Sequence, residues 1–278
     1  MNEIWLIESG WHATQMAKAA KAYSHSVDFL KQESNDDRVR SYFKQFNRLK
    51  DPMYMAAEGV GVIEVVGPLM SGAAPVDKWL GATDYKDIMR DIKAASNDPA
   101  VKAIVLDVDS GGGMALGAPE IADAIAELAQ TKPVVTHTST IMASAAYYVS
   151  AGATAVVASR SAIVGSIGTV AQVVDITAML ERFGVKIETF TPDQSDLKTA
   201  SYPTVKMTDA QRAWIKESVT ATNEDFMSFV TGQRPGVGSS AMRGQVFSGS
   251  RAEAAGLVDA LGSFEEAITL AGKLAGQG

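Results

Sequence analysis

The chain has 278 residues, of which 46% are hydrophobic and 21% charged, a balance that allows one sizeable buried core. Its 32 acidic residues against 25 basic ones give a formal net charge of −7, and no basic cluster interleaved with aromatic residues offers a track for nucleic-acid phosphates. Because cysteine is absent and only three histidines are present, disulfides and thiol chemistry are excluded, and we expect no metal, no cofactor and no direct nucleic-acid partner.

The N-terminal segment differs in pattern from the rest of the chain. Residues 1–55 are predicted to form a helical, amphipathic extension that ends near the turn signal Asp51-Pro52. Glu3 and Glu8 stand where an export signal would need a basic lead and an apolar run, so no such signal is predicted. Residues 56–278 are predicted to form one domain.

From Gly59 onward, β-rich runs alternate with helical patterns, which is typical of βαβ units around a parallel sheet. The predicted strands and helices, in chain order, are a strand over 59–67, a helix after Thr83-Asp84, a strand over 103–108, a helix over 116–130, a strand over 133–137, a helix over 143–150 and a strand over 153–158. Residues 133–159 carry no formal charge, but their small and polar residues indicate a buried strand and helix, so no membrane insertion is expected.

Two further helices are marked by capping boxes, in which a Ser or Thr precedes a Glu or Gln by three positions. Thr208 with Gln211 predicts one helix start, and Ser263 with Glu266 predicts the other.

Four segments could carry chemistry. The strand over 103–108 leads into Gly111-Gly112-Gly113, where backbone N–H groups can approach a ligand without side chains in the way. Ser144 stands at a predicted helix start, where it could cap the helix or serve as a nucleophile beside free N–H groups. Ser166 lies in a Gly-Ser-Ile-Gly turn, and Lys198 lies in a polar loop between two prolines.

Together, and in this order, these segments resemble the signal peptide peptidase A family of serine peptidases, especially its phage head-maturation branch. The resemblance runs from about Gly59 to Gly262 and includes Ala-Ser-Ala-Ala-Tyr-Tyr around Ser144 and the closing segment Arg243 to Gly262. The segment Ile-Trp-Leu-Ile-Glu from Ile4 suggests the phage branch. The resemblance implies an α/β fold of the Clp-protease/crotonase type, a repeated ββα superhelix, for residues 56–278.

The resemblance also implies roles for individual residues. Ser144 matches the nucleophile, Lys198 the general base, and Ser166 the hydroxyl that positions the lysine. Gly112, Gly113 and the N–H of Ala145 match the oxyanion hole. Since lysine must be neutral to accept a proton, the loop bearing Lys198 is expected to fold over the sheet, buried further by substrate or by a neighbouring subunit.

Several points stay open at this stage. The family usually has proline where Gly111 stands, which leaves open which glycine donates to the oxyanion. Lys186 and Lys206 are alternative bases, and His137 is a rival base whose position in a strand favours a core or surface role.

The activity implied is that of a serine endopeptidase that cleaves scaffold, portal or capsid proteins, and itself, inside an immature phage capsid or the host cytoplasm. The expected assembly is a homo-oligomer such as a ring. The alternatives are a cellular signal-peptide-peptidase-like protein, a crotonase-like acyl-CoA enzyme, and a non-catalytic assembly scaffold.

Overall fold

The computed structural model describes residues 5–7, 54–57 and 59–276. Most of the predicted N-terminal helical extension therefore lies outside the described residues. Its two described parts are strands: β1 (Trp5–Ile7) and β2 (Tyr54–Ala57). Strand β2 pairs antiparallel with β3 (Val60–Val66), so the main sheet already includes residue 54.

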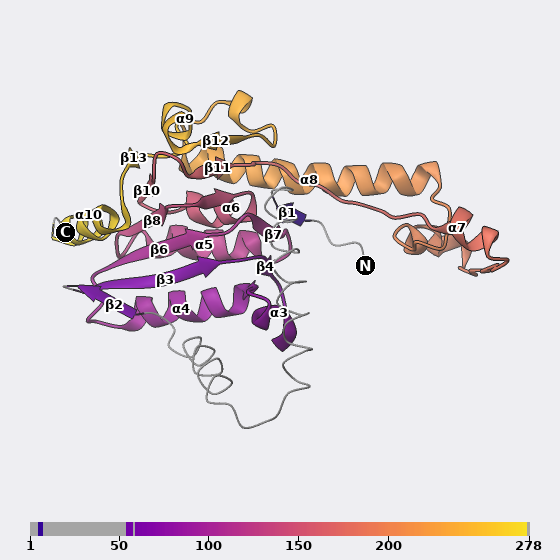
Figure 1. Ribbon diagram of the computed structural model, residues 1–278, viewed down its shortest axis with the longest axis horizontal. Helices are drawn as coiled ribbons and strands as arrows, with labels where there is room; N and C mark the ends of the chain where they lie inside the picture. The colour runs from indigo at the N-terminus through magenta and orange to yellow at the C-terminus, as the bar shows by residue number, and fades with distance from the viewer. Residues whose placement is uncertain (1–4, 8–53, 58, 277–278) are drawn as a thin grey trace, which may run out of the picture.

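The chain repeats a unit in which a long strand of the main sheet is followed by a short strand in a side sheet and then by a helix (Figure 1). The first unit holds β3, β4 (Leu69–Met70), α3 (Pro75–Trp79), β5 (Thr83–Asp84) and α4 (Tyr85–Asn97). The next two hold β6 (Ala103–Asp109), β7 (Gly112–Met114) and α5 (Ala118–Leu128), then β8 (Val134–Thr138), β9 (Ile141–Ala143) and α6 (Ala145–Ala151). The predicted α/β fold of repeated ββα units is confirmed.

The main sheet has the order β13-β10-β8-β6-β3-β2, in which all neighbours are parallel except β2 and β3. Strands β10 (Ala155–Ala158) and β11 (Ile163–Gly165) begin the fourth repeat. The short strands form two side sheets, β1-β7-β4-β5 and β12-β11-β9, with β12 at Val246–Ser248.

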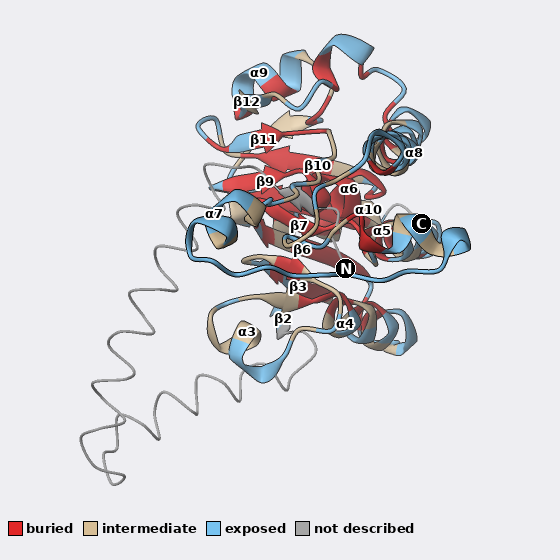
Figure 2. Cartoon of the chain, turned by 90° about the vertical axis from the view of Figure 1, so that its right-hand side faces the viewer, coloured by how far each residue is buried: buried red, intermediate tan, exposed pale blue. Residues whose placement is uncertain are grey.

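Both faces of the main sheet are covered, which explains why β6 is an almost continuous apolar run. Helices α4, α5 and α6 cover one face (Figure 2). Helix α10 (Phe264–Ala275) packs on the other face through Ala267 and Ala271. The uncharged segment 133–159 forms β8, β9, α6 and β10, as predicted. Within the described residues, no helix has the length and apolar character that a membrane crossing requires.

A long arm follows β11 and leaves the body of the molecule. It holds α7 (Thr177–Arg182) and the 3₁₀ helix η2 (Asp193–Thr199), and α8 (Asp209–Gln233) brings the chain back. Figure 1 shows α7 at the far end of α8, away from the sheet. The capping box of Thr208 and Gln211 starts α8 as predicted, and that of Ser263 and Glu266 starts α10.

The arm exposes large apolar side chains. Phe190 is 87% exposed and Phe183 78%, and Val174, Met179 and Ile187 are exposed as well. A group of exposed apolar residues of this kind marks a surface that a single chain leaves uncovered.

The C-terminal segment returns the chain to the body. It contains the 3₁₀ helix η3 (Ser239–Ala241), β12, α9 (Gly249–Ala254), β13 (Ala260–Leu261) and α10. The buried Arg234 guanidinium joins the end of α8 to the end of α6, because it donates to the carbonyls of Ala151 (3.1 Å) and Ala153 (2.8 Å) and to Asp259 (2.5 Å).

Candidate active site

Ser144 occupies the sharp turn between β9 and α6. Its backbone angles are φ 56° and ψ −123°, a conformation that strains residues other than glycine, and the residue is only 1% exposed. The N–H of Ser144 donates to the carbonyl of Gly165 (2.8 Å), and its carbonyl accepts from the N–H of Tyr148 (2.9 Å). The strained turn is therefore held by bonds on both sides.

The hydroxyl of Ser144 has no hydrogen-bond partner, although it is buried. Ser144 stands at the N-cap position of α6, but its side chain makes no capping bond. Leaving a buried hydroxyl unpaired costs about 1–3 kcal/mol. Strain and an unpaired hydroxyl at one residue indicate a functional role rather than a helix cap.

Ser166 lies beside Ser144. Strands β9 and β11 are parallel, with Ala143 opposite Gly165, so the register brings the two following residues, Ser144 and Ser166, next to each other. Ser166 has φ 53° and is buried, and its N–H donates to the carbonyl of Gln245 (2.8 Å). Among the described residues, these two serines are the non-glycine residues with positive φ.

Strand β7 brings the glycines to the same place. Ser110, just before β7, pairs with Met142 of β9, and α6 packs against β7. A Cβ atom on Gly113 would lie 1.9 Å from the carbonyl oxygen of Leu69, so only glycine fits there. The N–H of Gly112 donates to the Ser110 hydroxyl (3.1 Å), so in this conformation it is not free for an oxyanion.

Ala145 begins α6 directly after Ser144. The first N–H groups of a helix have no partner within the helix, and they point toward its N-terminal end. The sequence motifs around Ser144, Ala145, Ser166 and the β7 glycines therefore converge on one buried location.

Lys198 is not at this location within one chain. It is exposed in η2, where Gln211, in the first turn of α8, donates to the carbonyl of Asp196 (2.6 Å) and to the hydroxyl of Thr199 (3.1 Å). Near the other end of α8, Phe226 stacks on Tyr148 of α6 with ring centroids 4.5 Å apart. Fifteen helical residues separate Gln211 from Phe226, a rise of about 22 Å.

The expectation that the Lys198 loop folds over the sheet is thus not met within a single chain. The alternative bases Lys186 and Lys206 are exposed on the same arm. The reason is the length of α8, which carries the loop outward beyond the body (Figure 1).

His137 is a core residue. It lies in β8 with its ring against Phe264 of α10 (centroids 5.6 Å apart) and 1% exposed, and its Nδ1 is 3.8 Å from the Asp107 carboxylate. Since α10 covers the face of the sheet opposite to α6, His137 and Ser144 lie on opposite faces. The sequence-based prediction of a core or surface position for His137 is confirmed, because the residue lies in the core.

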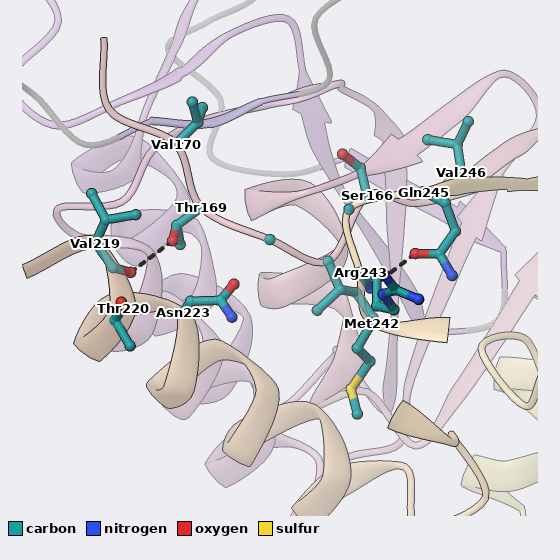
Figure 3. Close-up of a pocket in the computed structure, with 13 residues that line it drawn as sticks. Ser166, Thr169, Val170, Val219, Thr220, Asn223, Met242, Arg243, Gln245 and Val246 are labelled. Atoms are coloured by element: carbon teal, nitrogen blue, oxygen red, sulfur yellow. Dashed lines mark hydrogen bonds between the residues drawn. The ribbon is translucent and has the colours of Figure 1, made fainter. Parts of the chain in front are cut away.

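A cleft of about 930 Å³ opens beside Ser166 (Figure 3). Its walls come from the segment 166–170, from α8 at Val219 and Asn223, and from the segment 242–246. The Thr169 hydroxyl donates to the carbonyl of Val219 (2.8 Å) and fixes one wall to α8. Sequence reasoning did not find this cleft, because its walls come from three segments far apart in the chain.

The described part of the chain holds no cluster of three His, Asp or Glu side chains that could bind a metal ion. A buried serine at the start of a helix, whose first N–H groups have no partner within the helix, next to a second serine that lines a cleft, is an arrangement suited to nucleophilic attack on a carbonyl carbon.

Comparison with known proteins identifies the family. The chain belongs to peptidase family S49, whose model matches residues 126–278. It is 31% identical to "Capsid assembly protease C" of Escherichia phage lambda over 220 residues, which are 78% of this chain and 49% of that protein. It is 32% identical to "Protease 4" of Salmonella typhi over 271 residues, which are 93% of this chain and 41% of that protein.

The chain thus spans about half the length of such curated relatives. Among solved structures, it is similar to "ThnE from S.clavuligerus", with 13% identity, a TM-score of 0.40, and coverage of 81% of this chain and 83% of that one. The family resemblance seen in the sequence is confirmed by the family match and by the phage relative.

Proposed function

We propose that this chain is a serine endopeptidase in which Ser144 is the nucleophile. The observation that supports it best is the strained, buried and unpartnered Ser144 hydroxyl at the start of α6, in a chain that belongs to a peptidase family. Such strain persists where a residue must hold one orientation for chemistry.

We propose further that Lys198 of a neighbouring copy serves as the general base. About 22 Å of helix separates its loop from the level of Tyr148 in the same chain, and the arm that carries it exposes Phe183 and Phe190. Covering this apolar surface with a second copy would bury the loop, and burial favours the neutral lysine that can accept a proton. The expected homo-oligomer would then be required for activity.

In the proposed reaction, the Ser144 proton passes to the Lys198 amine while Oγ forms a bond to the carbonyl carbon of the substrate. The N–H of Ala145 and that of Gly113 or Gly112 stabilise the oxyanion, and Gly112 must first release the Ser110 hydroxyl. The protonated lysine then gives its proton to the leaving amine, and water hydrolyses the acyl-enzyme. The Ser166 hydroxyl orients the lysine.

The substrates proposed are polypeptides of an assembling phage head, such as scaffold, portal or capsid proteins, cleaved in the host cytoplasm or inside the immature capsid. The name of the phage lambda relative supports this class. A cellular peptidase that degrades peptides is the second candidate, supported by the similarity to Protease 4 over 93% of the chain.

Labelling with a fluorophosphonate probe, followed by peptide mass spectrometry, tests the nucleophile. The adduct is expected on Ser144, and the Ser144→Ala variant should take up no label. An adduct on another serine of the wild-type oligomer, or none at all, would remove Ser144 from this role.

A further inference from the structure

Strand β1 lies on the strand that carries the oxyanion glycines. The pairing is antiparallel, with Trp5 opposite Met114, Leu6 opposite Gly113 and Ile7 opposite Gly112 (Figure 1). More than a hundred residues separate the two strands in the chain. No local turn signal links them, so the pairing is a tertiary contact.

The edge of β7 that β1 covers is suited to binding an extended peptide. One side of β7 is already used, because Gly113 pairs with Leu69 of β4. In the side sheet of order β1-β7-β4-β5, the other side of β7 would be a free edge without β1. Free edges present unpaired N–H and C=O groups, which bind added strands through main-chain bonds that depend little on sequence.

The same edge of β7 lies close to the turn that holds Ser144, the proposed nucleophile. Ser110 pairs with Met142 just before β7 begins, and α6, which starts directly after Ser144, packs against β7. A chain paired with Gly112 and Gly113 therefore runs past the start of α6, with the cleft beside Ser166 close by. An extended substrate and β1 cannot occupy this edge together.

We infer that β1 is an internal competitor of the substrate, and that residues 5–7 hold the peptidase in a self-blocked state until a polypeptide displaces them. The inference rests on the proposed function, since it names the segment that regulates the same site. Only the fraction of molecules with β1 detached binds substrate, so the apparent affinity falls by that fraction.

The test replaces two consecutive residues of β1 by proline, Leu6→Pro/Ile7→Pro. Along an antiparallel strand, alternate residues direct their N–H and C=O toward the partner, so one of two consecutive prolines must remove a donor to β7. The matched control, Leu6→Val/Ile7→Val, keeps both N–H groups and the tendency to form a strand.

The proline variant should show a KM for an added peptide at least ~5-fold lower than wild type, equivalent to about 1 kcal/mol, with kcat unchanged. The valine variant should stay within about 2-fold of wild type, since its main-chain bonds are kept. An unchanged KM in a proline variant with the wild-type melting temperature would refute the self-blocked state.

A binding measurement separates this inference from the proposed function. The capped peptide acetyl-Ile-Trp-Leu-Ile-Glu-amide is titrated into the Ser144→Ala chain with and without the two prolines. At least ~5-fold tighter binding with the prolines is expected, and equal affinity would refute the inference. If no variant cleaves peptide, the proposed function fails, and this titration still decides the role of β1.

Should the prolines prevent folding, amide hydrogen exchange in the wild-type chain replaces the variant. The amides of Gly113 and Met114 cannot decide the question, because β7 is paired whether β1 or the peptide occupies its edge. The decisive readout is therefore the amides of residues 5–7. Their amides should lose protection when the capped peptide binds, and protection that persists at saturation would refute the competition.

Discussion

Replacing Ser144 by alanine should stabilise the fold while abolishing turnover. In the structure the Ser144 hydroxyl is buried without a partner and makes no capping bond. Alanine removes the polar group and its desolvation penalty of about 1–3 kcal/mol but keeps the strained backbone. We expect the free energy of unfolding to rise by about 1 kcal/mol, where loss of a helix cap would lower it by about the same amount.

Ser144→Gly should raise the stability of the fold further, because glycine adopts φ 56° without strain. Relief of strain of about 1–3 kcal/mol, less about 0.5–1 kcal/mol of added backbone entropy loss, should make this variant more stable than Ser144→Ala. Ser263→Ala is the matched control, since the Ser263 hydroxyl does accept from the N–H of Glu266 (3.3 Å) and its loss should cost about 1 kcal/mol.

The assay is urea unfolding followed by circular dichroism at one fixed protein concentration, because oligomers unfold in a concentration-dependent way. Stability in the order Ser144→Gly, Ser144→Ala, wild type, Ser263→Ala supports the reasoning. A Ser144→Ala chain destabilised as much as the Ser263→Ala chain would show that the hydroxyl makes a stabilising bond, and the argument from an unpartnered nucleophile would fail.

Three further outcomes are expected. Lys198→Met should lose turnover with a melting temperature close to wild type or higher, because methionine keeps an aliphatic side chain and removes the amine, whereas the variant of the buried His137, His137→Gln, should stay active. An active Lys198→Met with an inactive His137→Gln would move the base to histidine. Gly113→Ala should lose both folding stability and activity, because its Cβ would meet a carbonyl oxygen at 1.9 Å. The control Gly232→Ala, in α8 with open space around the position, should keep both. An active, stable Gly113→Ala would contradict the close approach. Burial raises the pKa of Asp91 to about 6, so the folded chain favours the protonated carboxyl, and this contribution to stability is lost as the pH rises through that value. Between about pH 4 and 7, the free energy of unfolding of wild type should therefore fall relative to that of Asp91→Asn. A difference between the two in urea unfolding that does not change with pH would contradict this.

Local patterns were sufficient to predict most of the fold. The apolar run from Ala103 to Val108 forms the central strand β6, and the two capping boxes start α8 and α10 at Thr208 and Ser263. These features depend on residues close together in the chain, where spacing and side-chain chemistry determine the structure.

The features that sequence could not predict depend on distant contacts. The N–H of Ser144, in its strained turn, donates to the carbonyl of Gly165 on another strand, and β1 pairs with β7 across more than a hundred residues. The position of Lys198 depends on how far α8 carries the arm, which capping signals do not specify. A motif match named these residues without saying whether one chain brings them together.

Mixing two inactive variants tests the proposed shared dyad most directly. Ser144→Ala keeps Lys198, and Lys198→Met keeps Ser144, so a mixed oligomer can pair an intact serine with an intact lysine from different copies. If subunits mix at random, roughly a quarter of the interfaces hold both groups, and peptide turnover should return to about that share of wild type. No turnover in an oligomer shown to contain both variants would contradict a base supplied by a neighbouring copy.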